Sequence, residues 1–145
     1  MRFVKVISPE TMLAQKLSYL QINDETRAIL RSFLPRLKQA IPDILNKFYA
    51  HISNEPQLAS FFSGPEHISL AKQAQTRHWE RMFSGNFDQD YFQSVERIGR
   101  THSRLGLAVG WYIGGYALVK QEIIGLVLAD VTDGSVLHRS RKLSE

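Results

Sequence analysis

The sequence contains no cysteine. This absence excludes disulfide bonds, catalysis by a thiolate, and zinc or iron–sulfur sites with cysteine ligands. A metal ion bound by this chain must therefore have histidine or carboxylate ligands. The rest of the composition is that of an ordinary globular domain, because 43% of the 145 residues are hydrophobic and 22% are charged.

Long uninterrupted apolar segments are also missing from the sequence. Residues 1–15 lack the apolar run and the small-residue cleavage site of a secretory signal. A membrane-spanning helix needs about 20 consecutive apolar residues, and we find no such segment. We therefore expect a cytoplasmic protein without a membrane span.

A concentrated basic surface is the third absence. The net charge of +4 arises from 18 basic and 14 acidic residues. The basic residues are spread along the chain, except for a cluster from His138 to Lys142. Proteins that bind nucleic acids usually gather lysine and arginine on one face or element, so we expect no nucleic-acid partner.

What the sequence does contain is a helical period. Apolar residues recur at spacings of three and four along nearly the whole chain, and no internal repeat, low-complexity segment or β-hairpin pattern interrupts them. The length of 145 residues fits one domain. We therefore expect a single all-α domain over residues 1–145, with residues 1–22 as an N-terminal arm that contains a short helix.

Capping residues and helix breakers divide this pattern into segments. Ser8 and Pro9 predict the start of the short helix, Pro35 predicts a bend, and Pro42 predicts the restart of a separate helix. The expected helices cover residues 9–19, 24–40, 41–53, 58–62, 66–84, 89–104 and 110–129.

The helix expected over residues 89–104 has one apolar face. Tyr91, Val95, Ile98 and His102 lie on that face, and such a histidine can face a flat apolar ligand. Haem needs one axial base, apolar side chains on both sides of the ring and a polar group near the bound gas, and the chain supplies each of these. On periodicity alone, however, a histidine on an apolar face is more often a core residue than a metal ligand.

Three segments resemble the sensor domain of globin-coupled sensors. They read His-Trp-Glu-Arg-Met-Phe-Ser-Gly-Asn-Phe-Asp-Gln-Asp-Tyr at 78–91, Ile-Gly-Arg-Thr-His-Ser-Arg-Leu-Gly-Leu at 98–107 and Trp-Tyr-Ile-Gly-Gly-Tyr at 111–116. The similarity extends upstream through Phe48 and Tyr49, and the segment around His102 is highly specific. The resemblance implies a globin fold of the sensor type with a short or missing last helix, and haem b as the cofactor.

The resemblance also implies roles for individual residues. It makes His102 the proximal haem ligand, and so the residue expected to bind the iron. It places Tyr49 on the distal side, where the hydroxyl can hydrogen-bond oxygen. It places Tyr112 against the proximal histidine, where it would orient the axial ligand. The alternative for Tyr49 is a half-buried core tyrosine whose hydroxyl reaches the surface or a carbonyl.

Other apolar residues are expected to line the haem, and they are Phe48, Leu70, Ala74, Phe83, Val95 and Ile98. On the expected distal helix, Leu70, Ala71 and Ala74 offer no second hydrogen-bond donor. The family pattern does not make His78 a ligand, and the neighbouring Trp79 indicates a packing or surface role for it.

The function implied by the resemblance is that of a gas sensor and not of an enzyme. Reversible binding of oxygen, with carbon monoxide and nitric oxide as alternative gases, would bias a dimer interface and regulate a signalling output C-terminal to this chain. The likeness to chemotaxis transducers favours a chemotaxis-type output module over a diguanylate cyclase or a histidine kinase. We expect a homodimer through the last long helix, whose apolar residues Trp111, Tyr116, Val119, Ile123 and Val127 exceed what one helix face needs.

Two alternatives remain open at this stage. A haem redox enzyme, such as a nitric-oxide dioxygenase or a peroxidase, would need a separate reductase, because no flavin or nicotinamide domain accompanies the chain. A haem-free globin-like interaction module would need no metal ligand, and the presence of His102 argues against it.

Overall fold

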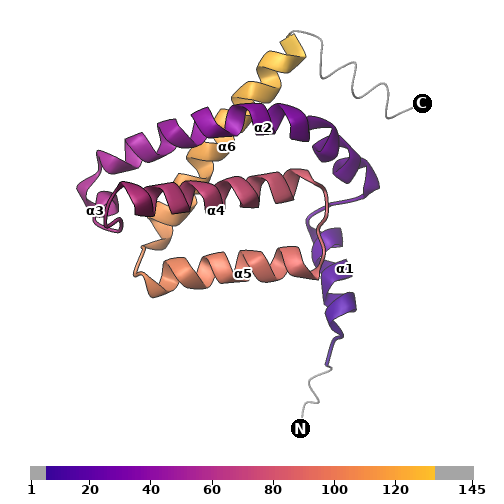
Figure 1. The fold of residues 1–145 in the computed structure, drawn as a ribbon. Helices are drawn as coiled ribbons and strands as arrows, with labels where there is room; N and C mark the ends of the chain where they lie inside the picture. Colours follow the sequence, from indigo (N-terminus) through magenta and orange to yellow (C-terminus); the bar gives the residue numbers. More distant parts are fainter. Residues whose placement is uncertain (1–5, 133–145) are drawn as a thin grey trace.

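The computed structural model describes residues 6–132, and within that range the chain folds into six α-helices without a strand (Figure 1). The predicted all-α class is therefore confirmed. The helices are α1 (Pro9–Tyr19), α2 (Asp24–Ser53), α3 (Pro56–Ala59), α4 (Pro65–Phe83), α5 (Gln89–Arg104) and α6 (Val109–Thr132). α6 continues past the end expected at residue 129 and includes Asp130, which is buried. The basic cluster at 138–142 lies outside the described residues.

Local capping explains where several helices begin. The Ser8 hydroxyl accepts a hydrogen bond from the backbone N–H of Thr11, and Pro9 occupies the first turn of α1. At the start of α5 the Asp88 carboxylate accepts from the N–H of Tyr91 at 2.8 Å. Such side chains satisfy amide groups that have no partner inside the helix. The predicted bounds of α1, α4 and α5 are confirmed to within one residue.

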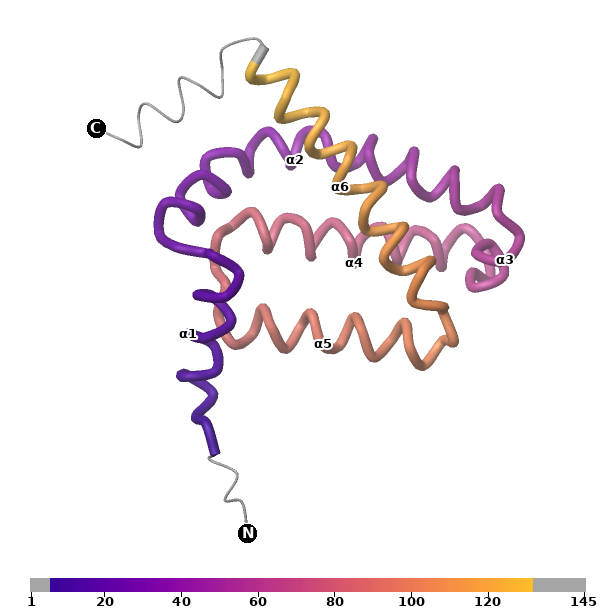
Figure 2. The backbone as a smooth tube through the Cα atoms, turned by 180° about the vertical axis from the view of Figure 1, so that it is seen from behind, coloured from indigo at the N-terminus to yellow at the C-terminus, as the bar shows by residue number. Residues whose placement is uncertain are grey.

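α2 is one helix, and the prediction of two helices separated at Pro42 is wrong. It runs continuously through Pro35 and Pro42 and curves along its length (Figure 2). Both prolines are on the exposed side, where a bend away from solvent accommodates the lost N–H groups. The opposite side buries a continuous apolar stripe, which consists of Phe33, Leu37, Ile41, Ile44, Leu45 and Tyr49.

The core lies where α2, α4 and α6 meet. α4 runs beside α2, and α6 crosses both (Figures 1 and 2). α4 contributes Trp79 and Phe83, and α6 contributes Val119 and Ile123. These side chains pack on the α2 stripe, so three helices share one hydrophobic core.

The turn between α4 and α5 is fixed by a glycine that packs against α2. Gly85 has a φ of +76°, and a Cβ atom there would lie 2.9 Å from the carbonyl oxygen of Arg27. Only glycine combines this backbone conformation with such a close approach. Gly85 lies just past the C-cap residue Ser84 of α4, and the turn sets the position from which α5 starts.

α6 is more apolar than the sequence analysis recognised. By length and composition the segment 109–131 could cross a membrane, so the statement that no segment is apolar enough is wrong. Lys120 and Glu122 interrupt its apolar residues, so the segment does not appear as an uninterrupted apolar run in the sequence. In the structure Lys47 of α2 forms an ion pair with Glu122 at 2.7 Å, and Val119 is buried. Only 11% of the apolar window of this helix is buried, so these contacts cover one part of α6 and leave most of it exposed. The absence of a membrane span stays a prediction.

Candidate functional site

The apolar face of α5 is clearly segregated but scarcely buried. Among the residues of this helix only Tyr91 is buried, while Val95, Ile98 and His102 remain half-buried. Near its start, the ammonium group of Lys16 on α1 lies 5.2 Å from the ring centre of Phe92. The helix is therefore anchored at its N-terminal end, and its apolar stripe stays open towards its C-terminal end.

A second open stripe lies on α4. The ring of His78 stacks on Tyr91 of α5 with a centroid distance of 6.2 Å and an interplanar angle of 14°. This contact turns one side of α4 towards α5, and the two helices run side by side in opposite directions (Figures 1 and 2). Leu70 and Ala74 precede His78 on that side at helical spacing, and Leu70 is 63% exposed. Two apolar stripes therefore face each other, which suits a flat apolar group.

His102 is held in one tautomer by its own helix. Its Nδ1 lies 2.8 Å from the carbonyl oxygen of Ile98. A carbonyl can only accept a hydrogen bond, so in the neutral ring Nδ1 carries the proton and Nε2 keeps its lone pair. The ring of Tyr112 on α6 lies 4.6 Å from the imidazole centre, tilted by 37°. His102 thus presents an oriented base at the end of the α5 stripe.

Tyr49 lies in the core between α2 and α4. Its ring makes edge contacts with Phe48 at 5.2 Å and with Phe62 at 5.8 Å. Its hydroxyl oxygen accepts a hydrogen bond from the Gln75 amide nitrogen at 3.0 Å. Burial raises the pKa of the Tyr49 phenol, and the hydrogen bond from Gln75 lowers it by a smaller amount. The phenol therefore stays protonated and can act as a donor.

The structure divides the remaining candidates. Phe48 points at α6, because a Cβ atom on Gly115 would lie 3.3 Å from its ring. Leu70, Ala74, Val95 and Ile98 belong to the two facing stripes. Phe83 does not join them, since it lies in the core with its ring centre 5.9 Å from that of Phe33. A haem-packing role for Phe83 is therefore not proposed further.

Two residues near Tyr49 were not singled out from the sequence. Gln75 donates to Tyr49, and the Gln75 amide oxygen accepts from the indole N–H of Trp79 at 3.2 Å. Trp79 is 3% exposed and packs on Tyr116 with a centroid distance of 4.9 Å. The available signal was a polar residue within the apolar stripe of α4, one turn before a tryptophan.

His78 packs between rings rather than beside His102. It contacts Trp79, Tyr91 and Tyr116, and desolvation by burial lowers its pKa. Within residues 6–132 no three histidine or acidic residues cluster as a metal site would require.

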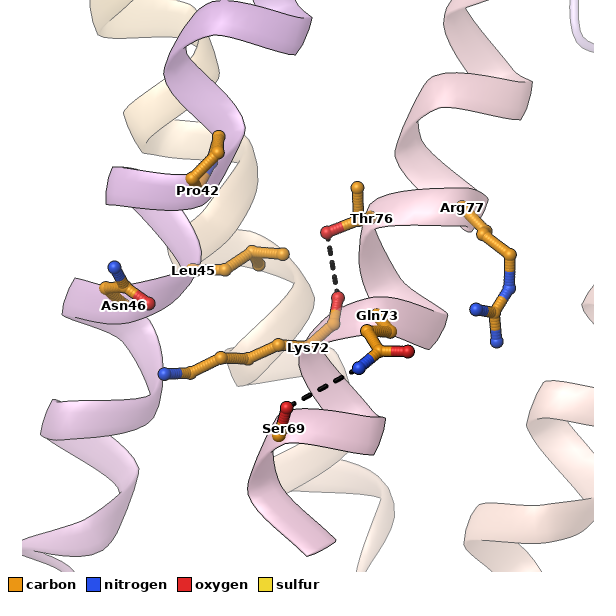
Figure 3. A pocket seen from close by; sticks show the side chains of 8 residues that line it. All are labelled: Pro42, Leu45, Asn46, Ser69, Lys72, Gln73, Thr76 and Arg77. Carbon is orange, nitrogen blue, oxygen red and sulfur yellow. Dashed lines mark hydrogen bonds between the residues drawn. The ribbon is translucent and has the colours of Figure 1, made fainter. Parts of the chain in front are cut away.

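Two hollows open on the surface of the described residues. One, with a volume of about 370 Å³, opens between α2 and α4 over Leu45 and is edged by polar side chains such as Lys72 and Gln73 (Figure 3). The other is an apolar groove of about 510 Å³ along α2, α4 and α6, lined by residues that include Phe33, Phe83 and Val127. His102 and Tyr112 line neither hollow.

Comparison with known proteins identifies the chain by its whole length rather than by single residues. The Protoglobin family model matches residues 10–142. A similar protein is the "Heme-based aerotactic transducer HemAT" of Halobacterium salinarum, with 25% identity over 123 residues that cover 84% of this chain. The chain spans 25% of the length of that relative. The resemblance to sensor globins and the expected globin fold are confirmed, and the chain belongs to the Protoglobin family.

Proposed function

We propose that this domain is a haem-based gas sensor that binds oxygen reversibly at a ferrous haem b and regulates a signalling output C-terminal to it. Membership of a globin family and similarity to a haem-based aerotactic transducer support haem binding. When bound, haem supplies an iron with one position for a histidine and one for a diatomic gas. The cytoplasm is the proposed location.

One observation carries the proposal. His102 closes an apolar stripe, and the Ile98 carbonyl holds its Nδ1 proton so that Nε2 is free as a base. Metal-binding histidines commonly donate their other ring N–H to a carbonyl, which fixes the ring and raises the basicity of the ligating nitrogen. The Tyr112 ring at 4.6 Å limits the ring orientations of His102 further.

The residues around His102 have different proposed contacts with the haem and the gas. Leu70, Ala74, Val95 and Ile98 would contact the flat faces of the macrocycle. Phe48 would close the side towards α6. Tyr49 would offer its hydroxyl to the gas ligand, since the phenol is buried and stays protonated.

Signal output requires a surface through which the domain can act, and we propose a homodimer through α6. Val119 and Ile123, which the sequence analysis placed in the seam, are buried in the core and are removed from it. Trp111 and Tyr116 of the predicted seam are exposed and stay in it. The other exposed large apolar residues of the same helix join them, and they are Val109, Ile113, Leu118, Ile124 and Leu128. A second copy of α6 is the proposed occupant of this surface.

Reconstitution with haem tests the proposal. Purified protein mixed with haem should give a six-coordinate oxygenated spectrum that returns to the ferrous form when oxygen is removed. Protein that shows no Soret band under these conditions would be the haem-free interaction module. Rapid, repeated consumption of nitric oxide with a generic reductant would instead identify the redox enzyme.

A further inference from the structure

Gln75, Trp79 and Tyr49 form a hydrogen-bonded chain between α4 and α2. The Trp79 indole N–H points to the Gln75 amide oxygen at 3.2 Å, and the Gln75 amide nitrogen points to the Tyr49 hydroxyl oxygen at 3.0 Å. Gln75 is half-buried, and both its partners are buried. None of the three serves a helix cap or an ion pair in these bonds.

The chain has only one consistent direction. An indole N–H can donate but cannot accept, so the oxygen of the Gln75 amide must face Trp79. The amide nitrogen then faces Tyr49 and can only donate. The orientation of the Gln75 amide is therefore set by the hydrogen-bonding chemistry at both ends.

This direction fixes the role of the Tyr49 hydroxyl. A phenol oxygen holds one proton, which lies near the ring plane on one side of the C–O bond. Gln75 donates to one side of that oxygen, so the proton of Tyr49 must point elsewhere. Within residues 6–132 no acceptor receives it. The hydroxyl is thus an oriented donor without a protein partner in the described part of the chain.

We propose that Gln75 is a positioning residue that turns the Tyr49 O–H towards the gas ligand. The inference rests on the proposed function, because it needs a ligand on the distal side. Gln75 itself does not touch the ligand in this scheme. It removes the alternative in which Tyr49 donates its proton to the protein.

Substitution by glutamate separates this role from simple packing. In Q75E the carboxyl group keeps the shape of the amide and can still accept from Trp79. An ionised carboxylate cannot donate to Tyr49, so the Tyr49 hydroxyl would donate to the carboxylate instead. The Tyr49 O–H would then no longer be available to hydrogen-bond the gas ligand. A protonated carboxyl can donate as the amide does. The single variant therefore switches Tyr49 between the two states as pH changes.

The surroundings favour a clean pH response. Position 75 faces the Tyr49 phenol from α2 and the Trp79 indole from its own helix, and Tyr116 of α6 lies behind Trp79. His78, on the same helix, contacts the Trp79 ring with a centroid distance of 5.8 Å. Lys72, one turn earlier on α4, lines the outward pocket. A half-buried glutamate here should titrate above its ordinary range because burial raises carboxyl pKa values.

Oxygen release from the haem-loaded protein is the first measurement. Stopped-flow release is expected to be about tenfold faster in Y49F than in wild type. Release from Q75E should match wild type at low pH and approach Y49F as pH rises. Q75M, which can neither donate nor accept strongly, should give an intermediate and pH-independent rate. Q73E places a carboxylate on the exposed side of α4 and is the matched control, with wild-type rates throughout.

Indole NMR of the haem-free protein supplies a readout that needs no cofactor. The two tryptophans give two ¹⁵N indole signals, and W79F assigns them. The Trp79 signal should move upfield in Q75M and stay in place in Q75E, whereas that of Trp111 should not move. An unshifted Trp79 signal in Q75M overturns the inference, as does a pH-independent rate in Q75E. Failure of wild-type protein to take up haem overturns the proposed function instead, and the distal role with it.

Discussion

The α2–α4 pair and the α5 helix are both amphipathic, yet they treat their apolar faces differently. α2 buries six side chains in one stripe, and α4 adds Trp79 and Phe83 to it. α5 buries Tyr91 and leaves Val95, Ile98 and His102 half-buried. A short turn that contains Gly85 joins α4 to α5. The two helices are therefore close in the chain, and their different burial does not come from a long connection between them.

The difference lies in what each face is complementary to. The α2 stripe has partners on α4 and α6 at van der Waals contact. The α5 stripe faces α4 across Leu70, which is 63% exposed. Burial of apolar surface is worth about 25 cal/mol per Å², so an unburied stripe of this kind favours association with an apolar group. One region thus completes its core with protein atoms, and we propose that the cofactor completes the other.

The largest expected effect breaks the second region alone. H102A removes the oriented base and should abolish stable haem incorporation, because the facing stripes supply only apolar contact. H78A should retain haem, since His78 packs on Tyr91, Trp79 and Tyr116. Absorption spectra after gel filtration compare the two variants. A normal spectrum from H102A would refute the ligand assignment.

The helix ends were predictable from sequence because caps act locally. Ser8, Asp88 and Gly85 each satisfy or permit a backbone conformation within a few residues. The continuity of α2 was not predictable from the sequence. Pro42 disfavours a helix locally, whereas the buried stripe from Phe33 to Tyr49 stabilises a continuous helix over a longer distance. Tertiary packing outweighed the local preference there.

The candidate site was predictable only in part for a related reason. Periodicity placed His102, Ile98 and Val95 on one face, but it does not state which neighbour a face meets. Phe83 has the same spacing as a lining residue and packs on Phe33 instead. Gln75 matters through contacts with Tyr49 and Trp79, and no spacing rule announces a contact between different helices.

The next prediction compares how much unfolding free energy each region loses when one of its side chains is truncated. L37A removes a side chain that is 0% exposed, and it should cost about 2–5 kcal/mol of unfolding free energy with or without haem. I98A should cost less than about 1 kcal/mol in the haem-free protein, because its side chain is only half-buried. With haem added, the loss in I98A should grow, since ligand binding to the folded state adds stability.

Urea denaturation of both variants, with and without haem, gives the four values needed. Equal losses for I98A in the two conditions would mean that the α5 stripe does not contact the cofactor. V119A, which truncates a core residue of α6, serves as a second haem-independent control.

A smaller effect concerns ligand choice. The Tyr49 hydroxyl should stabilise oxygen, which is a good hydrogen-bond acceptor as a ligand, more than carbon monoxide, which is a poor one. One such bond contributes about 1 kcal/mol net, and about twice that in a dry pocket. Y49F should therefore release oxygen roughly tenfold faster and autoxidise sooner, with carbon monoxide affinity little changed. Equal effects on the two gases would show that Tyr49 acts by packing.

The smallest expected effect tests the aromatic junction at which the two regions meet. Burial lowers the pKa of His78 below 6.5, so the unfolded state binds more protons than the folded state between the two pKa values. Unfolding free energy should then rise with pH through that window and level off above about pH 6.5. H78F keeps a ring against Tyr91 and removes the titration, so its stability should fall less on acidification. The difference in slope must stay well under about 1.4 kcal/mol per pH unit, because the side chain is partly solvated.

Urea midpoints of wild type and H78F between about pH 5.5 and about pH 7.5 measure this difference in slope, and H51Q, which removes an exposed histidine, is the control. A steeper dependence in H78F than in wild type would show that His78 is charged at the junction, and that α4 and α5 meet there by an electrostatic contact instead of an aromatic one.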